Sequence, residues 1–189
     1  MFELHGKNAI VTGGAKGIGR GIAHALVNQG ARVLLADLDR RECARTAGAL
    51  GPRAGWAACD VSDRRQVDAA VEKCAEEFGS VDILVNNAGI YPSRPFLQIT
   101  QREWDRIVAV NLTGVFNFSQ SAASRMVKRK KGGKIVNIAS IAALVGFNGL
   151  THYCATKGGI TGFTRALALE LAGQKINVNA IAPGAIETP

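Results

Sequence analysis

The segment T-H-Y-C-A-T-K-G-G places a phenol and an ammonium four residues apart, at Tyr153 and Lys157. On a helix this spacing brings both side chains to one face, about one turn apart. Free tyrosine has a pKa near 10, and a tyrosine that acts as a base at roughly pH 7 to 8 needs that value lowered by roughly 2 to 3. A nearby ammonium lowers it, because a positive charge stabilises the phenolate. The pair therefore predicts proton transfer, and a surface pair without chemistry is the alternative.

A glycine-rich turn, T-G-G-A-K-G-I-G from Thr12 to Gly19, follows the first apolar run. Its glycines stand at positions 13, 17 and 19, and Ile22 stands where the general motif G-x-G-x-x-G would place its last glycine. Such a turn lets backbone N–H groups approach a pyrophosphate, and the N-terminus of the following helix favours the negative charge. The turn predicts nucleotide binding, and a tight strand-to-helix connection without a ligand is the alternative.

Two acidic residues follow later strands. Asp37 ends the run V-L-L-A-D, about 20 residues after the glycine turn, where an acidic side chain hydrogen-bonds a ribose 2′-hydroxyl and repels a 2′-phosphate. Lys16 in the turn is a contrary sign, because a cation there can hold a 2′-phosphate. Leu38 and Asp39 follow, not an arginine, so we predict NAD rather than NADP. Asp60, after the third strand, is placed to contact the adenine edge. The alternatives are a helix cap at Asp37 and a turn residue at Asp60.

The elements that must position these residues alternate between short strands and longer helices. The expected strands are Asn8–Val11, Arg32–Ala36, Ala54–Cys59, Ile83–Asn86, Lys134–Ile138 and Ile176–Ile181. The expected helices are Gly17–Gln29, Arg40–Leu50, Arg64–Phe78, Gln101–Arg129 and His152–Leu171. This alternation predicts one α/β domain over residues 1–189, with a doubly wound parallel sheet and helices on both faces. Such sheets bind ligands at the carboxyl ends of their strands, where the residues above fall.

The composition is that of a globular chain that fits one domain, with 189 residues of which 47% are hydrophobic. No apolar run reaches the roughly 18 residues that a membrane helix needs. The N-terminus lacks the pattern of a secretory signal. We therefore expect a cytoplasmic protein without a membrane partner.

Charge and metal-binding residue types predict no further partner. The formal net charge is +8, but the dense basic run from Lys128 to Lys131 follows a helical pattern, where cations complement a helix C-terminus. We expect no nucleic acid partner. The four cysteines form no C-x-x-C and the three histidines no H-E-x-x-H, so we expect no metal site and no disulfide framework.

Taken in order along the whole chain, the motifs resemble those of the short-chain dehydrogenase/reductase family. They are T-G-x-x-x-G-x-G at 12–19, the acidic Asp37, D-V at 60–61, N-N-A-G at 86–89, Asn111 in V-N-L-T-G, Ser140 in N-I-A-S, Y-x-x-x-K at 153–157, and N-A-I-A-P-G at 179–184 followed by Thr188. The resemblance implies a Rossmann-like sheet of strand order 3-2-1-4-5-6, a nicotinamide cofactor, and oxidation or reduction of an alcohol–carbonyl pair.

The resemblance also implies site residues. It implies a catalytic tetrad of Asn111, Ser140, Tyr153 and Lys157, in which the serine donates to the substrate oxygen and the asparagine holds a water that links the lysine to solvent. Taken alone, Ser140 would cap a helix or turn, and Asn111 would be a mildly unfavourable surface residue of a helix. The implied cofactor contacts are Gly13, Lys16, Gly17, Ile18, Gly19, Asp37, Asp60, Val61, Asn87, Ala88, Gly89, Tyr153, Lys157, Ile186 and Thr188.

The resemblance implies two further expectations, one about oligomeric state and one about the C-terminal segment. Subunits of the family commonly meet through the helices that correspond to 101–129 and 152–171, which implies a homodimer or homotetramer. Family members continue past the P-G-x-x-x-T segment into a helical lid and a last strand, whereas the sequence given stops at Pro189. We therefore expect a substrate pocket that lacks one wall.

The leading functional hypothesis is an NAD-dependent oxidoreductase acting on a secondary alcohol/ketone pair. An NADPH-dependent 3-oxoacyl thioester (acyl-carrier-protein) reductase is the alternative, since P-G-A-I-E-T resembles that subgroup, but Asp37 disfavours NADP. From another class, a non-catalytic NAD-sensing protein would have no need of Tyr153. His152 and Cys154 flank the tyrosine at odd offsets, which point them away from its helix face. We therefore expect no role for either.

Overall fold

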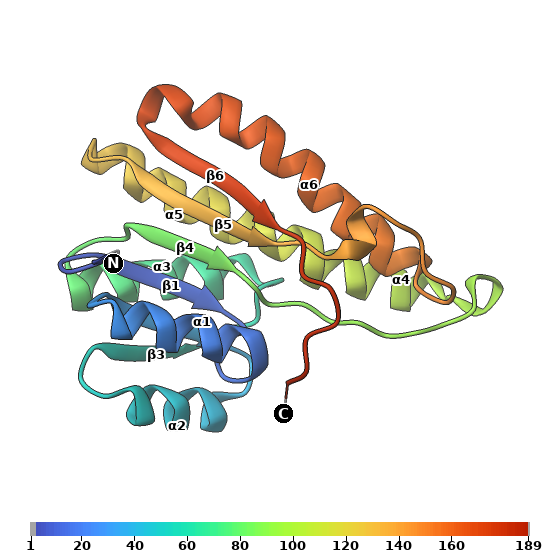
Figure 1. Cartoon of the computed structure of the whole chain (residues 1–189), viewed down its shortest axis with the longest axis horizontal. Coiled ribbons are helices and arrows are strands. Elements are labelled where there is room, and N and C mark those ends of the chain that lie inside the picture. The colour runs from blue at the N-terminus through green and yellow to red at the C-terminus, as the bar shows by residue number, and fades with distance from the viewer. Residues whose placement is uncertain (1–2, 189) are drawn as a thin grey trace.

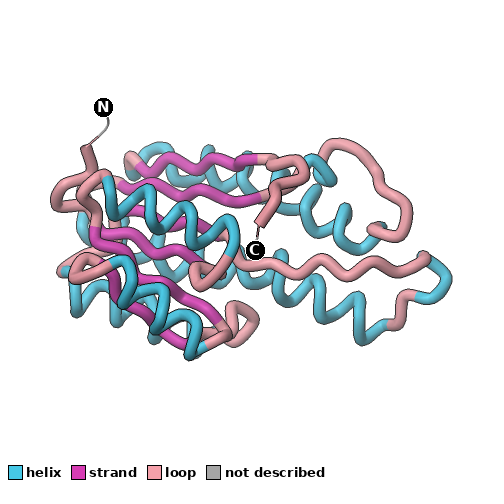
Figure 2. Tube along the Cα trace, turned by 60° about the horizontal axis from the view of Figure 1, so that its bottom comes forward, coloured by secondary structure: helices cyan, strands magenta, loops and turns pink. Residues whose placement is uncertain are grey.

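The structure, a computed structural model, describes residues 3–188 and contains a six-stranded parallel sheet with helices on both faces (Figures 1 and 2). The strands are β1 (Asn8–Thr12), β2 (Arg32–Asp37), β3 (Ala54–Ala58), β4 (Ile83–Asn86), β5 (Gly133–Ile138) and β6 (Ile176–Ile181). Their order across the sheet is β3-β2-β1-β4-β5-β6, which confirms the expected topology. All strands point the same way, but the direction in which successive strands are added reverses at β1, where the crossover from β3 leads to β4 on the other side of β1.

Most helices begin and end within one residue of their expected bounds. They are α1 (Gly17–Asn28), α2 (Arg40–Leu50), α3 (Arg64–Phe78), α4 (Gln101–Val108), α5 (Gly114–Arg129) and α6 (Thr151–Leu171). The expectation of one uninterrupted helix over 101–129 is wrong, because a π-helical turn at Ala109–Thr113 separates α4 from α5. Short 3₁₀ turns at Phe96–Gln98, Ile141–Ala143 and Ala172–Gln174 were not expected either. In the described part of the chain, no helix combines the length and apolar character needed to cross a membrane.

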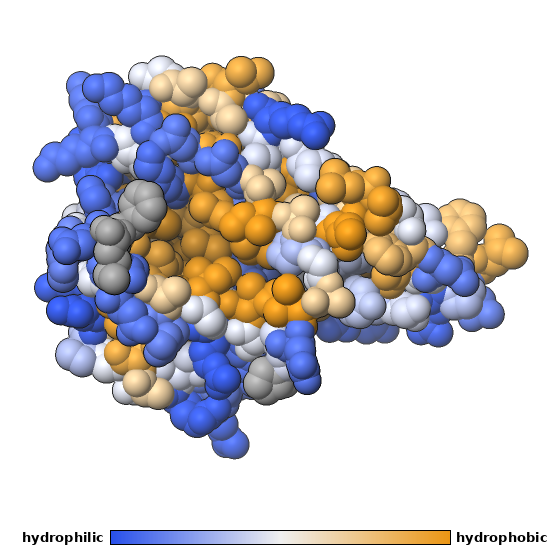
Figure 3. All heavy atoms as spheres, viewed as in Figure 1, coloured by the Kyte–Doolittle hydropathy of each residue, from blue (hydrophilic) through white to orange (hydrophobic). Residues whose placement is uncertain are grey.

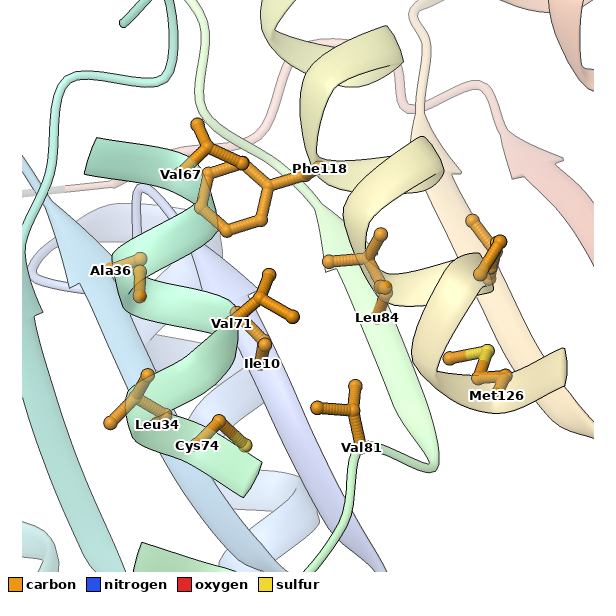
Figure 4. Packing of buried hydrophobic residues seen from close by; sticks show 14 of the residues in the cluster. Ile10, Leu34, Ala36, Val67, Val71, Cys74, Val81, Leu84, Phe118 and Met126 are labelled. Carbon is orange, nitrogen blue, oxygen red and sulfur yellow. The ribbon is translucent and has the colours of Figure 1, made fainter. Parts of the chain in front are cut away.

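Alternate residues of each central strand point to opposite faces of the sheet and pack into two separate hydrophobic cores. Ile10 and Leu84 belong to the core on the side of α3 and α5, where Phe118 lies beside Val67 (Figure 4). Their neighbours along the strands pack with α1 and α2 on the other side. This double coverage explains why the central strands read as continuous apolar runs.

Coverage of the second face is incomplete. The helices α1 and α2 lie over the half of the sheet that contains β1, β2 and β3 (Figure 1). Apolar side chains gather in a hollow beside them, on the part of this face that the two helices leave open (Figure 3).

Candidate active site

The glycine turn between β1 and α1 has a backbone that few other residues allow. Gly13 and Gly17 have φ values of 60° and 52°, in the left-handed region that favours glycine. A Cβ on Gly19 would lie 2.1 Å from the carbonyl oxygen of Gly13, so only glycine fits there. No side chain of residues 3–188 caps the first turn of α1. Its backbone N–H groups are therefore open to an anion, which fits the pyrophosphate of a dinucleotide.

A cleft of about 850 Å³ lies at the carboxyl ends of the strands, beside this turn. That volume is within the usual range for a small-molecule or cofactor site, roughly 300 to 1,000 Å³. The expected cofactor contacts that line it are Gly13, Lys16, Gly17, Ile18, Asp37, Asp60, Val61, Asn87, Ala88, Gly89 and Thr188. Sequence reasoning missed Leu38 and Arg106, which also line the cleft. A residue one place beyond a strand end, such as Leu38, could have been included on position alone.

Asp37 does not cap the next helix. Its carboxylate accepts hydrogen bonds from the backbone N–H groups of Ala15 and Asp39, both at 3.0 Å. The cap of α2 is Asp39, which accepts from the N–H of Glu42 at 3.1 Å. Asp37 is thereby tied to the glycine turn and lines the cleft. The cap alternative for Asp37 is wrong.

The segment that follows β4 is tied to the same turn. The Asn87 amide donates to the carbonyl oxygens of Thr12 and Gly13, at 2.9 and 3.1 Å. The Thr12 hydroxyl accepts from the N–H groups of Asn87 and Ala88. Thr12 and Asn87 therefore hold two strand ends together and shape the cleft between them.

Asp60 forms a local turn and also lines the cleft. One carboxylate oxygen accepts from the Ser62 N–H at 2.9 Å and from its hydroxyl at 2.6 Å. The cap of α3 is Asp63 instead. Cys59 lines the cleft too, but burial raises the pKa of its thiol to about 12. That thiol is neutral at physiological pH.

A smaller pocket of about 150 Å³ contains three members of the expected tetrad, Ser140, Tyr153 and Lys157. It shares Ile18, Asn87, Gly89 and Ile90 with the large cleft. The two hollows are therefore neighbours at one edge of the sheet. A molecule in the cleft can reach the tyrosine and the serine.

Lys157 is buried beneath Tyr153, with 4% of its surface exposed. Its ammonium donates to the carbonyl oxygen of Ile138 at 2.7 Å and lies 5.7 Å from the centre of the tyrosine ring. Burial lowers the pKa of Lys157 to about 8. Tyr91 packs edge-on against the Tyr153 ring, at 5.2 Å between ring centres. The end of β5 and the loop after β4 thus hold the pair from two sides.

Ser140 both caps a turn and faces the pocket. Its hydroxyl oxygen accepts from the N–H of Ala142 at 3.1 Å, which caps the 3₁₀ turn after β5. A hydroxyl that accepts in this way keeps its own hydrogen to donate. The cap alternative is confirmed, and it leaves the donor free for a substrate oxygen.

Asn111 is fully buried in the π-helical turn, so the surface alternative is wrong. Its amide oxygen accepts from the Ile90 N–H at 2.8 Å, and its amide nitrogen donates to the Ile90 carbonyl at 2.9 Å and to the Thr156 hydroxyl at 3.3 Å. The Thr156 hydroxyl in turn donates to the carbonyl oxygen of Tyr153 at 2.8 Å. Asn111 therefore links the loop after β4 to the start of α6.

Two expected contacts and two flanking residues lie apart from the hollows. Gly19 packs inside the turn, and Ile186 is 55% exposed outside both linings. His152 is fully buried, and its ring nitrogens make no hydrogen bond with any described residue. Cys154 is partly buried on α6. Among residues 3–188, no group of three or more His, Cys, Asp or Glu side chains could hold a metal ion.

Fold and site together define an α/β protein with a cofactor-sized cleft at the carboxyl edge of a parallel sheet, next to a Ser-Tyr-Lys pocket. The family described as short chain dehydrogenase matches residues 7–189. A sorbitol dehydrogenase of Cereibacter sphaeroides is 42% identical over 186 residues, which cover 98% of this chain and 73% of that protein. A galactitol 2-dehydrogenase of Agrobacterium fabrum is 43% identical over 186 residues, with the same 98% and 73% covered.

A solved structure of similar fold and sequence supports the same family. A 3-ketoacyl-(acyl-carrier-protein) reductase from Brucella melitensis, complexed with NADH, matches with a TM-score of 0.95 at 40% identity, over 98% of this chain and 78% of that one. The chain therefore belongs to the short-chain dehydrogenase family. It is an oxidoreductase of this family, which uses a nicotinamide cofactor.

Proposed function

We propose that the chain transfers a hydride between a nicotinamide cofactor and a secondary alcohol/ketone pair, with Tyr153 as the general acid/base. The observation that carries the proposal is the shared wall of the two hollows. Ser140, Tyr153 and Lys157 meet in one pocket, and that pocket opens beside a cleft lined by the glycine turn. A cofactor and a substrate can therefore meet at the tyrosine.

When bound, the nicotinamide accepts or supplies the hydride. The residues of the chain hold the substrate oxygen and move its proton. In oxidation, the Tyr153 hydroxyl oxygen takes the proton of the alcohol, and in reduction the same oxygen returns it. The Ser140 hydroxyl donates to the substrate oxygen as negative charge develops there. The Lys157 ammonium, beside the tyrosine ring, stabilises the phenolate by attraction of opposite charges.

Asn111 has a positioning role in this proposal. Its amide fixes Ile90 and contacts Thr156, so it holds the pocket wall and the first turn of α6 at one separation. Its oxygen has a second lone pair, which can hold the water that passes protons from Lys157 to solvent.

We propose NAD rather than NADP as the cofactor. The support is Asp37, whose carboxylate lies at the cleft and is held there by two backbone N–H groups. A carboxylate at this place accepts from a ribose 2′-hydroxyl and repels a 2′-phosphate. The NADH complex of the Brucella reductase is consistent with this preference.

We propose a polyol or a similar small secondary alcohol as the substrate class, since the sorbitol and galactitol dehydrogenases are close relatives. The likeness to the Brucella reductase favours a second candidate, reduction of a 3-oxoacyl thioester. A panel of polyols, simple secondary alcohols and a 3-oxoacyl thioester, with both cofactors, separates the two through absorbance at the reduced nicotinamide band. Oxidation of polyols with NAD supports the first, and exclusive thioester reduction with NADPH contradicts it. Cofactor binding with no turnover of any compound would favour an NAD sensor.

We also propose that two or four copies associate, in the cytoplasm, through the outer faces of α5 and α6. A groove of about 480 Å³ runs between these helices and is lined by apolar side chains including Phe116, Val127, Phe163 and Leu167. A second copy of the same face would cover it. Analytical ultracentrifugation tests this, and a monomer at micromolar concentration would contradict it.

A further inference from the structure

Two residues near the adenosine end of the cleft carry opposite charges, and neither belongs to the proposed chemistry. Lys16 stands in the glycine turn and lines the cleft together with Asp37. Asp39 caps α2, two residues beyond Asp37. The position of Lys16 would suit a 2′-phosphate, whereas Asp37 would repel one. The structure shows what Lys16 contacts instead.

The Lys16 ammonium is paired with Asp39. Its nitrogen lies 2.9 Å from one carboxylate oxygen of Asp39, across the gap between the glycine turn and α2. The other carboxylate oxygen accepts from the Glu42 N–H at 3.1 Å, and the Asp39 N–H donates to Asp37 at 3.0 Å. One hydrogen bond to the Asp39 carboxylate and one from its backbone N–H therefore hold this residue in the orientation that reaches Lys16.

The pair has little to do with fold stability. Its side chains are 61% and 46% exposed, and exposed pairs of this kind contribute little. Each partner favours the charged form of the other, which raises the pKa of Lys16 and lowers that of Asp39. Both are therefore charged at neutral pH. The consequence is local, because the cation beside the cleft already has a counter-ion.

We propose that Asp39 is a second determinant of cofactor choice, which acts by engaging the Lys16 ammonium so that it is not available to a 2′-phosphate. Asp37 repels the phosphate, and Asp39 removes the cation that would compensate for this repulsion. The proposal rests on the proposed function, in that a nicotinamide dinucleotide occupies the cleft. It differs in assigning discrimination to a residue that does not itself line the cleft.

The test is the dissociation constant of NADPH and of NADH, measured by fluorescence titration of the reduced nicotinamide. Asp39→Asn removes the carboxylate charge, and asparagine caps a helix as well as aspartate does. We expect the dissociation constant of NADPH to fall by about fivefold, the upper end of what the loss of an exposed ion pair can return. We expect that of NADH to change by less than about threefold, because NADH carries no 2′-phosphate. Asp39→Ser keeps a cap without a carboxylate and should behave alike.

Two further variants test whether the change in NADPH affinity acts through Lys16 or through the general negative charge of α2. Glu42→Gln removes one negative charge from the same turn of α2, where Glu42 pairs with Arg45, and should leave the NADPH to NADH ratio nearly unchanged. Lys16→Met combined with Asp39→Asn should abolish the gain in NADPH affinity. Salt should shrink the gain, because the residues are exposed.

The outcomes separate this proposal from the proposed function. If NADH binds the unsubstituted chain but neither Asp39 variant improves NADPH binding beyond Glu42→Gln, the role of Asp39 is wrong and the cofactor assignment stands. If the gain survives Lys16→Met, another cation such as Arg106 in the cleft holds the phosphate, and the proposal is again wrong. If neither dinucleotide binds, both the inference and the proposed function fail.

Discussion

Lys157 carries a charge in a place that disfavours it. The side chain is almost fully buried, its ammonium has the carbonyl of Ile138 as a hydrogen-bond partner, and burial lowers its pKa to about 8. At pH 7 the group is still protonated, as the proposed chemistry requires. The chain therefore gives up stability to keep a cation beside Tyr153, a trade that is common where function needs a strained or charged site.

This trade predicts a gain in stability when the charge is removed. Lys157→Met should raise the free energy of unfolding at pH 7 by about 1 to 3 kcal/mol, although it loses the Ile138 hydrogen bond and the activity. The pKa of the folded state, about 8, lies below the ordinary 10.5, so the unfolded chain binds more protons between these values. Stability of the unsubstituted chain therefore rises with pH through this window, and the advantage of the variant should shrink there.

Urea unfolding at several pH values measures this difference. Lys7→Met is the control, because Lys7 is exposed and should change stability by less than about 0.5 kcal/mol at any pH. A Lys157→Met variant that is less stable than the unsubstituted chain at pH 7, by an amount independent of pH, would contradict the account.

Position at strand ends made most cleft residues predictable. Asp37 is the last residue of β2, and Asp60 and Asn87 follow β3 and β4 within two residues. Because these strands are parallel, the three side chains had to meet at one edge. The pairing of Lys16 with Asp39 was not predictable, because it depends on rotamers and on the cap geometry of α2. Sequence position likewise does not reveal that Ser140 caps a turn and keeps a donor free.

At the scale of elements, the π-helical turn is the feature that periodicity concealed. The apolar pattern runs on through Ala109–Thr113, so the sequence predicts one uninterrupted helix. A π-turn adds a residue to the turn and re-aims the side chains around it, and such turns are frequent at functional sites. Here the turn carries Asn111 inward to the backbone of Ile90.

Removal of the Asn111 amide should therefore destabilise the chain. Asn111→Leu leaves the N–H and carbonyl of the partly buried Ile90 without their partner, and each unsatisfied group costs about 1 to 3 kcal/mol when water does not replace the lost bond. We expect a loss of about 2 to 4 kcal/mol in the free energy of unfolding, measured with urea. Asn28→Leu, at the exposed end of α1, is the matched control and should change stability by less than about 0.5 kcal/mol. Equal effects of the two substitutions would show that Asn111 does not hold the loop.

At the scale of the whole molecule, one edge of the sheet collects residues from most of the chain. The strand order places the carboxyl end of β1 beside those of β2 and β4, and β5 follows next to β4. The cleft therefore spans β3 to β4, and the pocket continues it from β4 to β5. A cofactor laid along this edge leads from Asp37 toward Tyr153, which is the arrangement that hydride and proton transfer to one substrate require.

The central claim is that Tyr153 moves the substrate proton while the rest of the edge binds the cofactor. The most direct measurement compares turnover and NADH affinity of Tyr153→Phe with those of Tyr91→Phe, which removes a phenol hydroxyl from the same pocket. With the alcohol of the panel that the unsubstituted chain oxidises fastest, Tyr153→Phe should lower kcat by about 10² to 10⁴-fold, the usual contribution of general acid–base catalysis. Its dissociation constant for NADH should stay within about threefold, because the ring still packs against Tyr91. Tyr91→Phe should retain most of the turnover. A Tyr153→Phe variant with kcat close to that of the unsubstituted chain would contradict the account, since the proton would then pass through another group.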